Sequence, residues 1–227
     1  MLALRLVLTF VAMALVAGTV LFGAAGTLSW LMGWCYVILV SAVSVGSRLI
    51  LLWVSPDTLR ERARFAKVKG VEPGDRALVA IVATVGPLAV LLVAGLDHRF
   101  RWSGPLPGAV TAAAVAAALA GAALVTWAMA VNKFFSAVAR IQTDRGHVLV
   151  SAGPYHWIRH PGYAGSVIAT LAIPVMLGSL WGLVPAVLTA VAIAIRTARE
   201  DRMLRRGLAG YQAYAETIRW RLVPGVW

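Results

Sequence analysis

The chain has 227 residues, of which 60% are hydrophobic and 13% are charged, and its mean hydropathy is +0.81. Polar residues are too few to cover a water-soluble domain of this size, so an ordinary soluble fold is excluded. The formal net charge is +12, but the basic residues lie in short loops between apolar runs. This pattern is typical of orientation signals and contacts with anionic membrane lipids, and it argues against a nucleic-acid partner.

The N-terminal part of the chain contains four apolar runs, and each reaches the roughly 20 residues that a helix needs to cross a bilayer. The first two lie between Leu6 and Arg48 and are separated by the uncharged, turn-like segment 26–29; the others are 77–96 and 106–132. We therefore expect an all-α, polytopic membrane bundle with about four N-terminal spans. Arg48, near the end of the second run, is expected to extend toward the cytosolic membrane interface.

Basic residues are distributed unevenly over the loops. The 55–76 loop carries six of them, the 97–105 loop carries two, and the 26–29 turn carries no charge. The positive-inside rule predicts that the N-terminus, the 55–76 loop, the 133–163 segment and the C-terminus are cytosolic. The predicted location is an inner or plasma membrane of bacterial type. The basic residues of the 55–76 loop are Arg60, Arg62, Arg64, Lys67, Lys69 and Arg76.

The segment 164–195 contains no charged residue. As one straight helix it would measure about 48 Å, which exceeds a hydrocarbon core of about 30 Å. The sequence therefore predicts a helical hairpin with its tip at 177–180, where glycine and serine favour a turn. Such a hairpin would return Arg196 and Glu200 to the membrane face that holds the residues preceding it.

Polar and ring-bearing side chains are concentrated in 153–163, directly before the hairpin. Charged and imidazole groups at a membrane boundary are costly unless a polar ligand meets them. The segment is therefore either a cofactor site or an interfacial loop whose Arg and His contact phosphate headgroups and whose aromatic rings form a belt. A metal site is disfavoured, because the spacing of His147, His156 and His160 suits no common ligand set and the single cysteine, Cys35, lies inside a span.

Arg196 and Glu200 are four positions apart, which places them on one face of a helix and within reach of each other. An exposed pair of this kind would be an ordinary surface contact. At the point where a buried helix emerges, however, the acid can hold a cationic or hydroxyl group, and the guanidinium can hold a carboxylate or phosphate.

The order of these motifs resembles the isoprenylcysteine carboxyl methyltransferase and phospholipid methyltransferase superfamily. The resemblance covers the C-terminal part of the chain, and the combined order is much more specific than any single motif. It implies a single integral membrane domain with transmembrane spans in 1–132, a cofactor-binding methyltransferase core in 133–227 and a cytosolic C-terminal helix. The matching segments are His147–Val150, Gly153–Tyr155, Arg159–Tyr163, Arg196, Glu200–Asp201, Gly210–Tyr214 and Arg221–Pro224.

The resemblance implies S-adenosylmethionine as the cofactor and an arginine, Arg196, that faces the substrate. Gln142 is near a cofactor-contacting glutamine of the family, but its register is offset. The usual Glu-Glu pair is Glu-Asp here, which leaves a direct role for Asp201 open. The cofactor-binding positions carried over from the family are His147, Val148, Leu149, Val150, Tyr155, His160, Pro161, Gly162, Tyr163 and Glu200.

Methyl transfer from a sulfonium requires mainly that the reacting atoms are aligned in a dry pocket. A carboxylate acceptor could be oriented by Arg196 without a general base, whereas an amine acceptor would need Glu200 or His160 to remove its proton. The expected acceptor is a lipid-like or prenyl-like molecule. Two alternatives remain open: an NADPH-dependent membrane sterol or steroid reductase, which also carries an Arg-His-Pro-x-Tyr stretch, and a lipid-binding membrane protein without catalytic activity.

Overall fold

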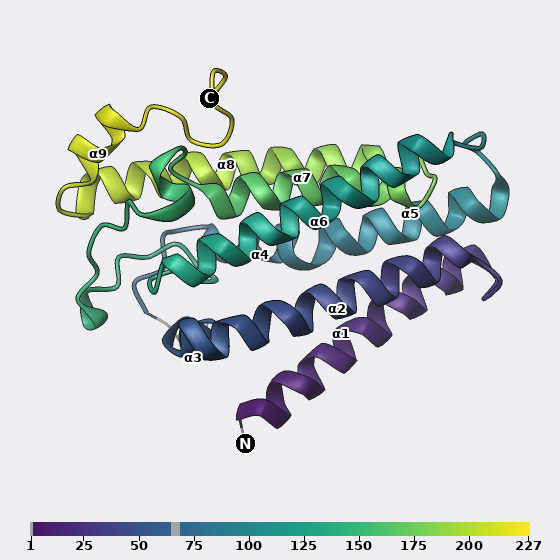
Figure 1. The fold of residues 1–227 in the computed structure, drawn as a ribbon, viewed down its shortest axis with the longest axis horizontal. Coiled ribbons are helices and arrows are strands. Elements are labelled where there is room, and N and C mark those ends of the chain that lie inside the picture. Colours follow the sequence, from purple (N-terminus) through teal and green to yellow (C-terminus); the bar gives the residue numbers. More distant parts are fainter. Residues whose placement is uncertain (1, 65–68) are drawn as a thin grey trace.

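The computed structural model describes residues 2–64 and 69–227; Lys67, one of the basic loop residues, lies outside them. Within the described residues there is no β-strand, which confirms the predicted all-α class. Figure 1 shows the helices as an elongated bundle. They are α1 (Leu2–Ala25), α2 (Leu31–Val54), α3 (Pro56–Ala63), α4 (Asp75–Ala80), α5 (Gly86–Phe100), α6 (Gly108–Val131), α7 (Pro161–Met176), α8 (Leu183–Gly207) and α9 (Tyr211–Thr217).

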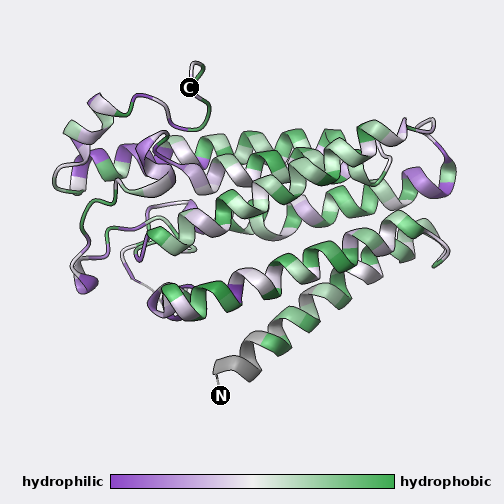
Figure 2. Cartoon of the chain, viewed as in Figure 1, coloured by the Kyte–Doolittle hydropathy of each residue, from purple (hydrophilic) through white to green (hydrophobic). Residues whose placement is uncertain are grey.

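Three helical segments of the described chain are long and apolar enough to cross a membrane. They are Leu31–Val54, Asp75–Phe100, in which a π-helical turn joins α4 to α5, and Gly108–Val131. α1 adds a shorter apolar stretch, Phe10–Ala25. Figure 2 shows hydrophobic residues along the middle of the bundle and hydrophilic residues gathered toward its two ends. This is the pattern of a helical membrane protein, because apolar side chains must face the hydrocarbon core.

The hairpin that the uncharged segment predicts is present, and its tip is where the sequence places it. α7 ends at Met176, Gly178 adopts φ +74°, and α8 begins at Leu183. Glycine suits this turn because a side chain would strain the left-handed backbone. The tip is tied to the end of α5, since the Ser179 hydroxyl donates to a carboxylate oxygen of Asp97 at 2.5 Å.

α6 and α7 pack so closely that glycine is required where they cross. A Cβ atom on Gly121 would lie 2.5 Å from the carbonyl oxygen of Gly165, and one on Gly165 would lie 2.5 Å from that of Gly121. Small residues of this kind let membrane helices approach at backbone distance. The close crossing fixes the start of α7, and with it Tyr163, against the segment that follows α6.

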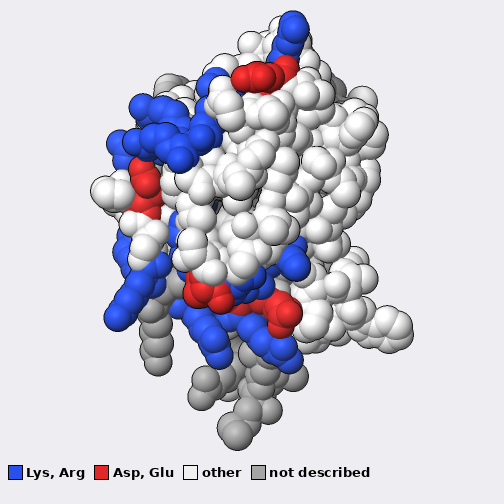
Figure 3. All heavy atoms as spheres, turned by 90° about the vertical axis from the view of Figure 1, so that its left-hand side faces the viewer, with Lys and Arg blue, Asp and Glu red and all other residues white. Residues whose placement is uncertain are grey.

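The candidate site residues gather at one end of the bundle, which we call the polar end. It consists of α3, the connection 132–160 between α6 and α7, the last turns of α8, and α9. Figure 1 shows these segments together on its left-hand side. The space-filling view of that side shows Lys and Arg side chains spread over the surface, with fewer acidic side chains between them (Figure 3). Positive charge is therefore concentrated at the polar end, and the cytosolic orientation of this end stays a prediction.

Arg48 contacts its own helix and α1, and its expected extension toward the cytosolic membrane interface stays a prediction. Its Nη1 donates to the carbonyl oxygen of Ser44 at 3.1 Å, one turn back along α2, and its guanidinium lies 5.9 Å from the centre of the Phe10 ring. Helical side chains incline toward the N-terminus of their helix, and the N-terminal end of α2 is the end away from α3.

Candidate functional site

A cavity of about 490 Å³ opens at the polar end, enclosed by α2, α3, α6, α7, α8 and the connection 132–160. One half of it is bordered by the connection and the last turns of α8. The other half reaches between membrane helices, where Val43, Ser44 and Ser47 of α2 line one wall and Val79 and Val82 line another. The cavity therefore joins a polar compartment to the apolar interior of the bundle.

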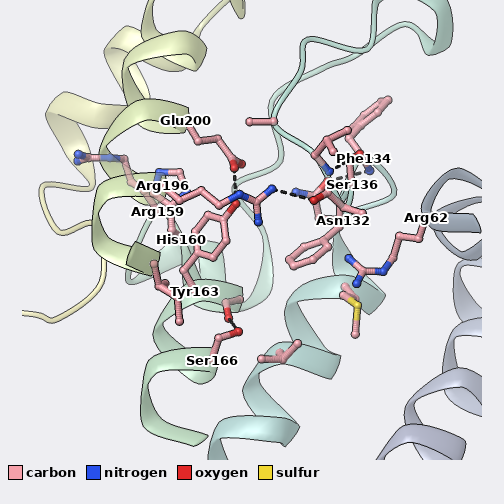
Figure 4. Close-up of a pocket in the computed structure, with 18 of the residues that line it drawn as sticks. Arg62, Asn132, Phe134, Ser136, Arg159, His160, Tyr163, Ser166, Arg196 and Glu200 are labelled. Carbon is pink, nitrogen blue, oxygen red and sulfur yellow. Dashed lines mark hydrogen bonds between the residues drawn. The ribbon is translucent and has the colours of Figure 1, made fainter. Parts of the chain in front are cut away.

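The chain reversal at the hairpin brings Tyr163 and Glu200 into direct contact. The Tyr163 hydroxyl, in the first turn of α7, donates to a carboxylate oxygen of Glu200 at 2.5 Å, although 37 positions separate them. Both side chains line the cavity, and Figure 4 shows them meeting across it. The predicted convergence of the imidazole-bearing turn and the emerging acid is therefore present in the structure.

The structure brings nearly all of the sequence-predicted residues to this one cavity. Pro161 is the exception: it is buried in the first turn of α7 and does not line the cavity, and its contribution is a backbone suited to the start of a helix. The predicted residues that do line the cavity are Gln142, His147, Val148, Leu149, Val150, Tyr155, His160, Gly162, Tyr163, Arg196 and Glu200.

The connection 132–150 is held in place by its own side chains. Gln142 is buried, and its amide nitrogen donates to the carbonyl oxygen of Phe134 at 2.5 Å. The backbone N–H of Gln142 donates to Nδ1 of His147 at 3.3 Å, and the His147 ring packs 4.5 Å from that of Phe134. Burial, together with the charges of Arg140 and Arg145, lowers the pKa of His147 to about 4. His147 is therefore a neutral hydrogen-bond acceptor at ordinary pH.

The helical spacing suggested that Arg196 pairs with Glu200, but this pair is not formed. The partner of Arg196 is Asp75, at the start of α4. Its Nε donates to Asp75 at 2.8 Å, and its Nη2 donates to the carbonyl oxygen of Ala137 at 2.8 Å. Both members of the pair are nearly fully buried. An acid 121 positions away is the better partner because it holds the guanidinium in fork geometry out of water.

Two buried acids of the 55–76 loop thus support the site, and the sequence analysis missed both. Asp75 also accepts a hydrogen bond from the backbone N–H of Ala139 at 2.7 Å. Glu61, in α3, pairs with Arg140 at 2.7 Å, and both are buried. The available signal was the presence of acidic residues within a strongly basic loop. The loop is therefore part of the wall of the cavity, attached to the connection 132–160 by ion pairs.

The sequence left open whether Asp201 contacts the cofactor directly. In the structure Asp201 belongs to a buried ion-pair network. Its side chain is fully buried and pairs with Arg159 at 2.8 Å, and it does not line the cavity. Burial alone would raise the pKa of Asp201, but hydrogen bonds from His160 and Arg159 outweigh this and hold the pKa below its usual range. The other groups around its oxygens are Tyr211 at 3.0 Å, Arg221 at 3.1 Å and Arg205 at 3.2 Å.

This network fastens the C-terminal segment over the site. Arg159 donates to the carbonyl oxygens of Ile218 and Arg219 at 2.6 and 2.9 Å. His160 is held as well, since its Nε2 lies 3.3 Å from the Tyr211 hydroxyl. On the other side, the Tyr214 hydroxyl donates to the carbonyl oxygen of Tyr155 at 2.6 Å. The turn 153–160 is therefore fixed between α8 and α9 before any ligand binds.

Together, the fold and the cavity define a helical membrane protein with a cavity between its polar end and its membrane helices. Residues 113–206 match the Isoprenylcysteine carboxyl methyltransferase (ICMT) family. The match runs from α6 to the end of α8 and confirms the resemblance to this superfamily that the C-terminal motifs indicate. It supports a membrane methyltransferase. No curated protein matches the chain.

Proposed function

We propose that the protein transfers a methyl group from S-adenosylmethionine to a lipid-like acceptor at the cytosolic face of the membrane. The observation that carries the proposal is the contact between Tyr163 and Glu200 inside a cavity that continues between the membrane helices. A soluble cofactor and a membrane-embedded acceptor need a site of this kind, because each must approach from a different compartment.

The residues present fit the cofactor. Among the described residues, none forms an ion pair with Glu200, so its carboxylate is available for a cationic ligand, and S-adenosylmethionine carries an ammonium and a sulfonium group. We call the half of the cavity that borders the connection 132–160 and the last turns of α8 the cofactor half. There Leu149, Leu204 and Leu208 form an apolar wall suited to a nucleobase. The cavity volume of about 490 Å³ also lies within the range of small-molecule sites, about 300 to 1,000 Å³.

The proposed roles follow from these positions. When bound, the cofactor would supply a methyl group on a positively charged sulfur. The acceptor would take this methyl group by in-line displacement, with the neutral thioether as the leaving group. The protein needs to hold the two reactants in line and to exclude water, which lowers the barrier by removing their freedom of motion. Tyr163 orients the Glu200 carboxylate, and His147, Tyr155 and His160 shape the cofactor half, with Gln142 fixing the connection behind them.

Two kinds of acceptor, a carboxylate and an ammonium group, would need different help from the protein. A carboxylate acceptor attacks without losing a proton, whereas an ammonium acceptor must first lose one to Glu200 or His160. His160 is already engaged by Asp201 and Tyr211, which leaves Glu200 as the more accessible base. Arg196 lines the cavity but is neutralised by Asp75, so we propose that it positions the acceptor through a guanidinium already fixed in place.

A binding experiment tests the cofactor assignment directly. We expect the purified protein in detergent micelles to bind S-adenosylmethionine, and we expect Glu200→Ala to abolish binding and Tyr163→Phe to weaken it by about tenfold, the effect of losing one hydrogen bond to a charged group. Isothermal titration calorimetry would measure both. Glu216→Gln is a matched control, because this acid lies on the exposed side of α9.

The same titration with NADPH distinguishes the reductase alternative. Binding of NADPH in place of S-adenosylmethionine would identify the reductase. Binding of neither molecule would favour a lipid-binding protein without catalytic activity. If Glu200→Ala remains folded and binds S-adenosylmethionine as tightly as the wild type, the proposed site is wrong.

A further inference from the structure

A second charged side chain, besides that of Glu200, lines the cavity without a charged partner. It belongs to α3, next to the part of the cavity that reaches between the membrane helices, which we call the acceptor half. Arg62, in the last turn of α3, lines the cavity, and Figure 4 shows its guanidinium directed toward the cavity, on the side away from Glu200. Its Cζ lies 5.6 Å from the centre of the Phe135 ring. No hydrogen bond or ion pair joins its guanidinium to any residue of 2–64 or 69–227.

The missing partner is not an acid elsewhere in the chain. All nine acidic residues lie within the described ranges, and every one of them has another partner. The undescribed residues 65–68 are Phe, Ala, Lys and Val, so they contribute no carboxylate. The pairs are Asp57 with Arg60, Glu61 with Arg140, Glu72 with Arg206, Asp75 with Arg196, Asp97 with Ser103, Asp144 with Arg140, Glu200 with Tyr163, Asp201 with Arg159 and Glu216 with Gln212.

The surroundings of Arg62 disfavour its charge. Burial is the largest cause that lowers the pKa of its guanidinium; the charges of Arg196 and Arg48 act in the same direction, and Tyr163 acts against them. A desolvated cation without a counter-charge destabilises the empty site, and a bound anion would stabilise it. The ring of Phe135 compensates only in part, since a cation-π contact is weaker than a desolvated ion pair.

The position of Arg62 indicates which ligand would supply the anion. Arg62 belongs to α3, which directly follows the membrane helix α2, and Ser44 and Ser47 of α2 line the cavity where it reaches between the membrane helices. The cofactor-binding positions 147–150 come instead from the connection that leads to the hairpin. An anion at Arg62 would therefore belong to the acceptor, at the boundary between its polar group and its apolar chain.

We propose that Arg62 forms an anion-binding position in the acceptor half of the cavity, and that the acceptor is an anionic amphiphile whose carboxylate or phosphate binds there. This inference rests on the proposed function, because it takes the acceptor half as given. It differs from the role that the family resemblance implies for Arg196, whose charge is already balanced by Asp75. A carboxylate at Arg62 would be the methylated group or adjoin it, whereas a phosphate would be the linker of a phospholipid headgroup.

The test uses three amphiphiles that share one dodecyl chain and fluorophore and end in a carboxylate, a phosphate or an ammonium group. Their dissociation constants are measured by fluorescence anisotropy on the full-length protein in phosphatidylcholine nanodiscs saturated with S-adenosylmethionine. We expect the wild type to prefer both anions over the ammonium probe, and Arg62→Gln to weaken binding of the anions by about tenfold. Arg62→Glu should reverse the preference.

Arg60→Gln is the matched control, because Arg60 lies on the same short helix with its side chain exposed and paired with Asp57; it should leave all three affinities unchanged. The anion that binds more tightly identifies the carboxylate or the phosphate source. Equal affinities for the three probes, or an Arg62→Gln variant that binds anions as the wild type does, would overturn the inference. A loss of S-adenosylmethionine affinity in Arg62→Gln with anion binding unchanged would overturn it as well. Absence of S-adenosylmethionine binding, with Arg62-dependent anion binding retained, would contradict only the proposed function.

Discussion

Two neighbouring acids of α8, Glu200 and Asp201, belong to different regions of the molecule. Glu200 is half-buried, lines the cavity and accepts one hydrogen bond, from Tyr163. Asp201 is fully buried, faces the C-terminal segment and receives donors from Arg159 and Tyr211, among others. One step along a helix turns a side chain by about 100°, so adjacent residues can face a binding cavity and a closed ion-pair network.

The comparison shows how charge is divided at the polar end. The region around Asp201 is saturated: cations and hydroxyls surround one carboxylate, and the turn 153–160 and the C-terminal segment are fixed by it. Among the described residues, the cavity holds two side chains that form no ion pair, Glu200 and Arg62. Charges that are paired within the protein hold the fold together, whereas unpaired charges in the cavity favour binding of an oppositely charged ligand. The reason is that an unpaired buried charge carries a desolvation cost that a partner offsets.

The largest effect is expected for Asp201→Asn. The substitution leaves Arg159 as a buried cation without a carboxylate, and removal of one partner of a buried pair typically costs about 3 to 5 kcal/mol in the free energy of unfolding. Thermal denaturation in detergent micelles would measure the loss. Glu200→Gln should change stability by only about 0.5 kcal/mol, as expected for substitutions outside buried networks. Similar losses in the two variants would remove the distinction between the regions.

A smaller loss of stability is expected for Asp75→Asn. This variant tests whether the buried acid Asp75 stabilises the fold or limits the positive charge of the cavity. An asparagine oxygen can still accept the hydrogen bond from Ala139, and Arg196 keeps the carbonyl of Ala137, so we expect a stability loss of about 1 to 3 kcal/mol. Because Arg196 would lose its counter-charge, the variant should also bind anionic amphiphiles more tightly than the wild type. Asp57→Asn is the control, since that acid forms an exposed pair. An unchanged anion affinity would show that Asp75 does not limit the charge of the cavity.

The smallest effect is expected for the pH dependence of stability and cofactor affinity that His147 causes. Its pKa is lowered from 6.5 to about 4 in the fold, so the unfolded chain takes up a proton at higher pH than the folded protein does. The stability contributed by the neutral ring is complete above 6.5 and is lost as the pH falls toward 4. We expect S-adenosylmethionine affinity to stay constant as the pH falls through 6.5 and to decrease only near 4, as measured by titration calorimetry. A decrease already at 6.5 would show that the ring is charged in the binding site.

The helical hairpin could be predicted because its causes are local. An uncharged segment too long for one crossing must reverse, and Gly178 lies at the point where the turn is found. The reversal in turn predicted that Tyr163 and Glu200 share one site. Eleven of the residues that line the cavity were also predicted, from the family resemblance, and they lie in or next to the two segments that the hairpin joins.

The partners of the buried arginines could not be predicted in this way. Helical spacing suggested Glu200 for Arg196, yet the ion pair joins α8 to Asp75, and Arg140 pairs with Glu61. Any acid of the 55–76 loop would have satisfied the sequence pattern equally well. Which acid becomes buried depends on how that loop packs against the connection 132–160, a contact between segments far apart in the chain.

The sequence by itself determined the membrane class, the helical composition, the hairpin and the chemical character of the site, because hydropathy, charge and turn preference act over short stretches of chain. Only the tertiary structure decided which charges cancel. It neutralised Arg196 through Asp75, enclosed Asp201 in a network of donors, and left Glu200 and Arg62 facing the cavity. Coulombic pairing depends on distance and burial, and neither is fixed until helices from both halves of the chain have packed together.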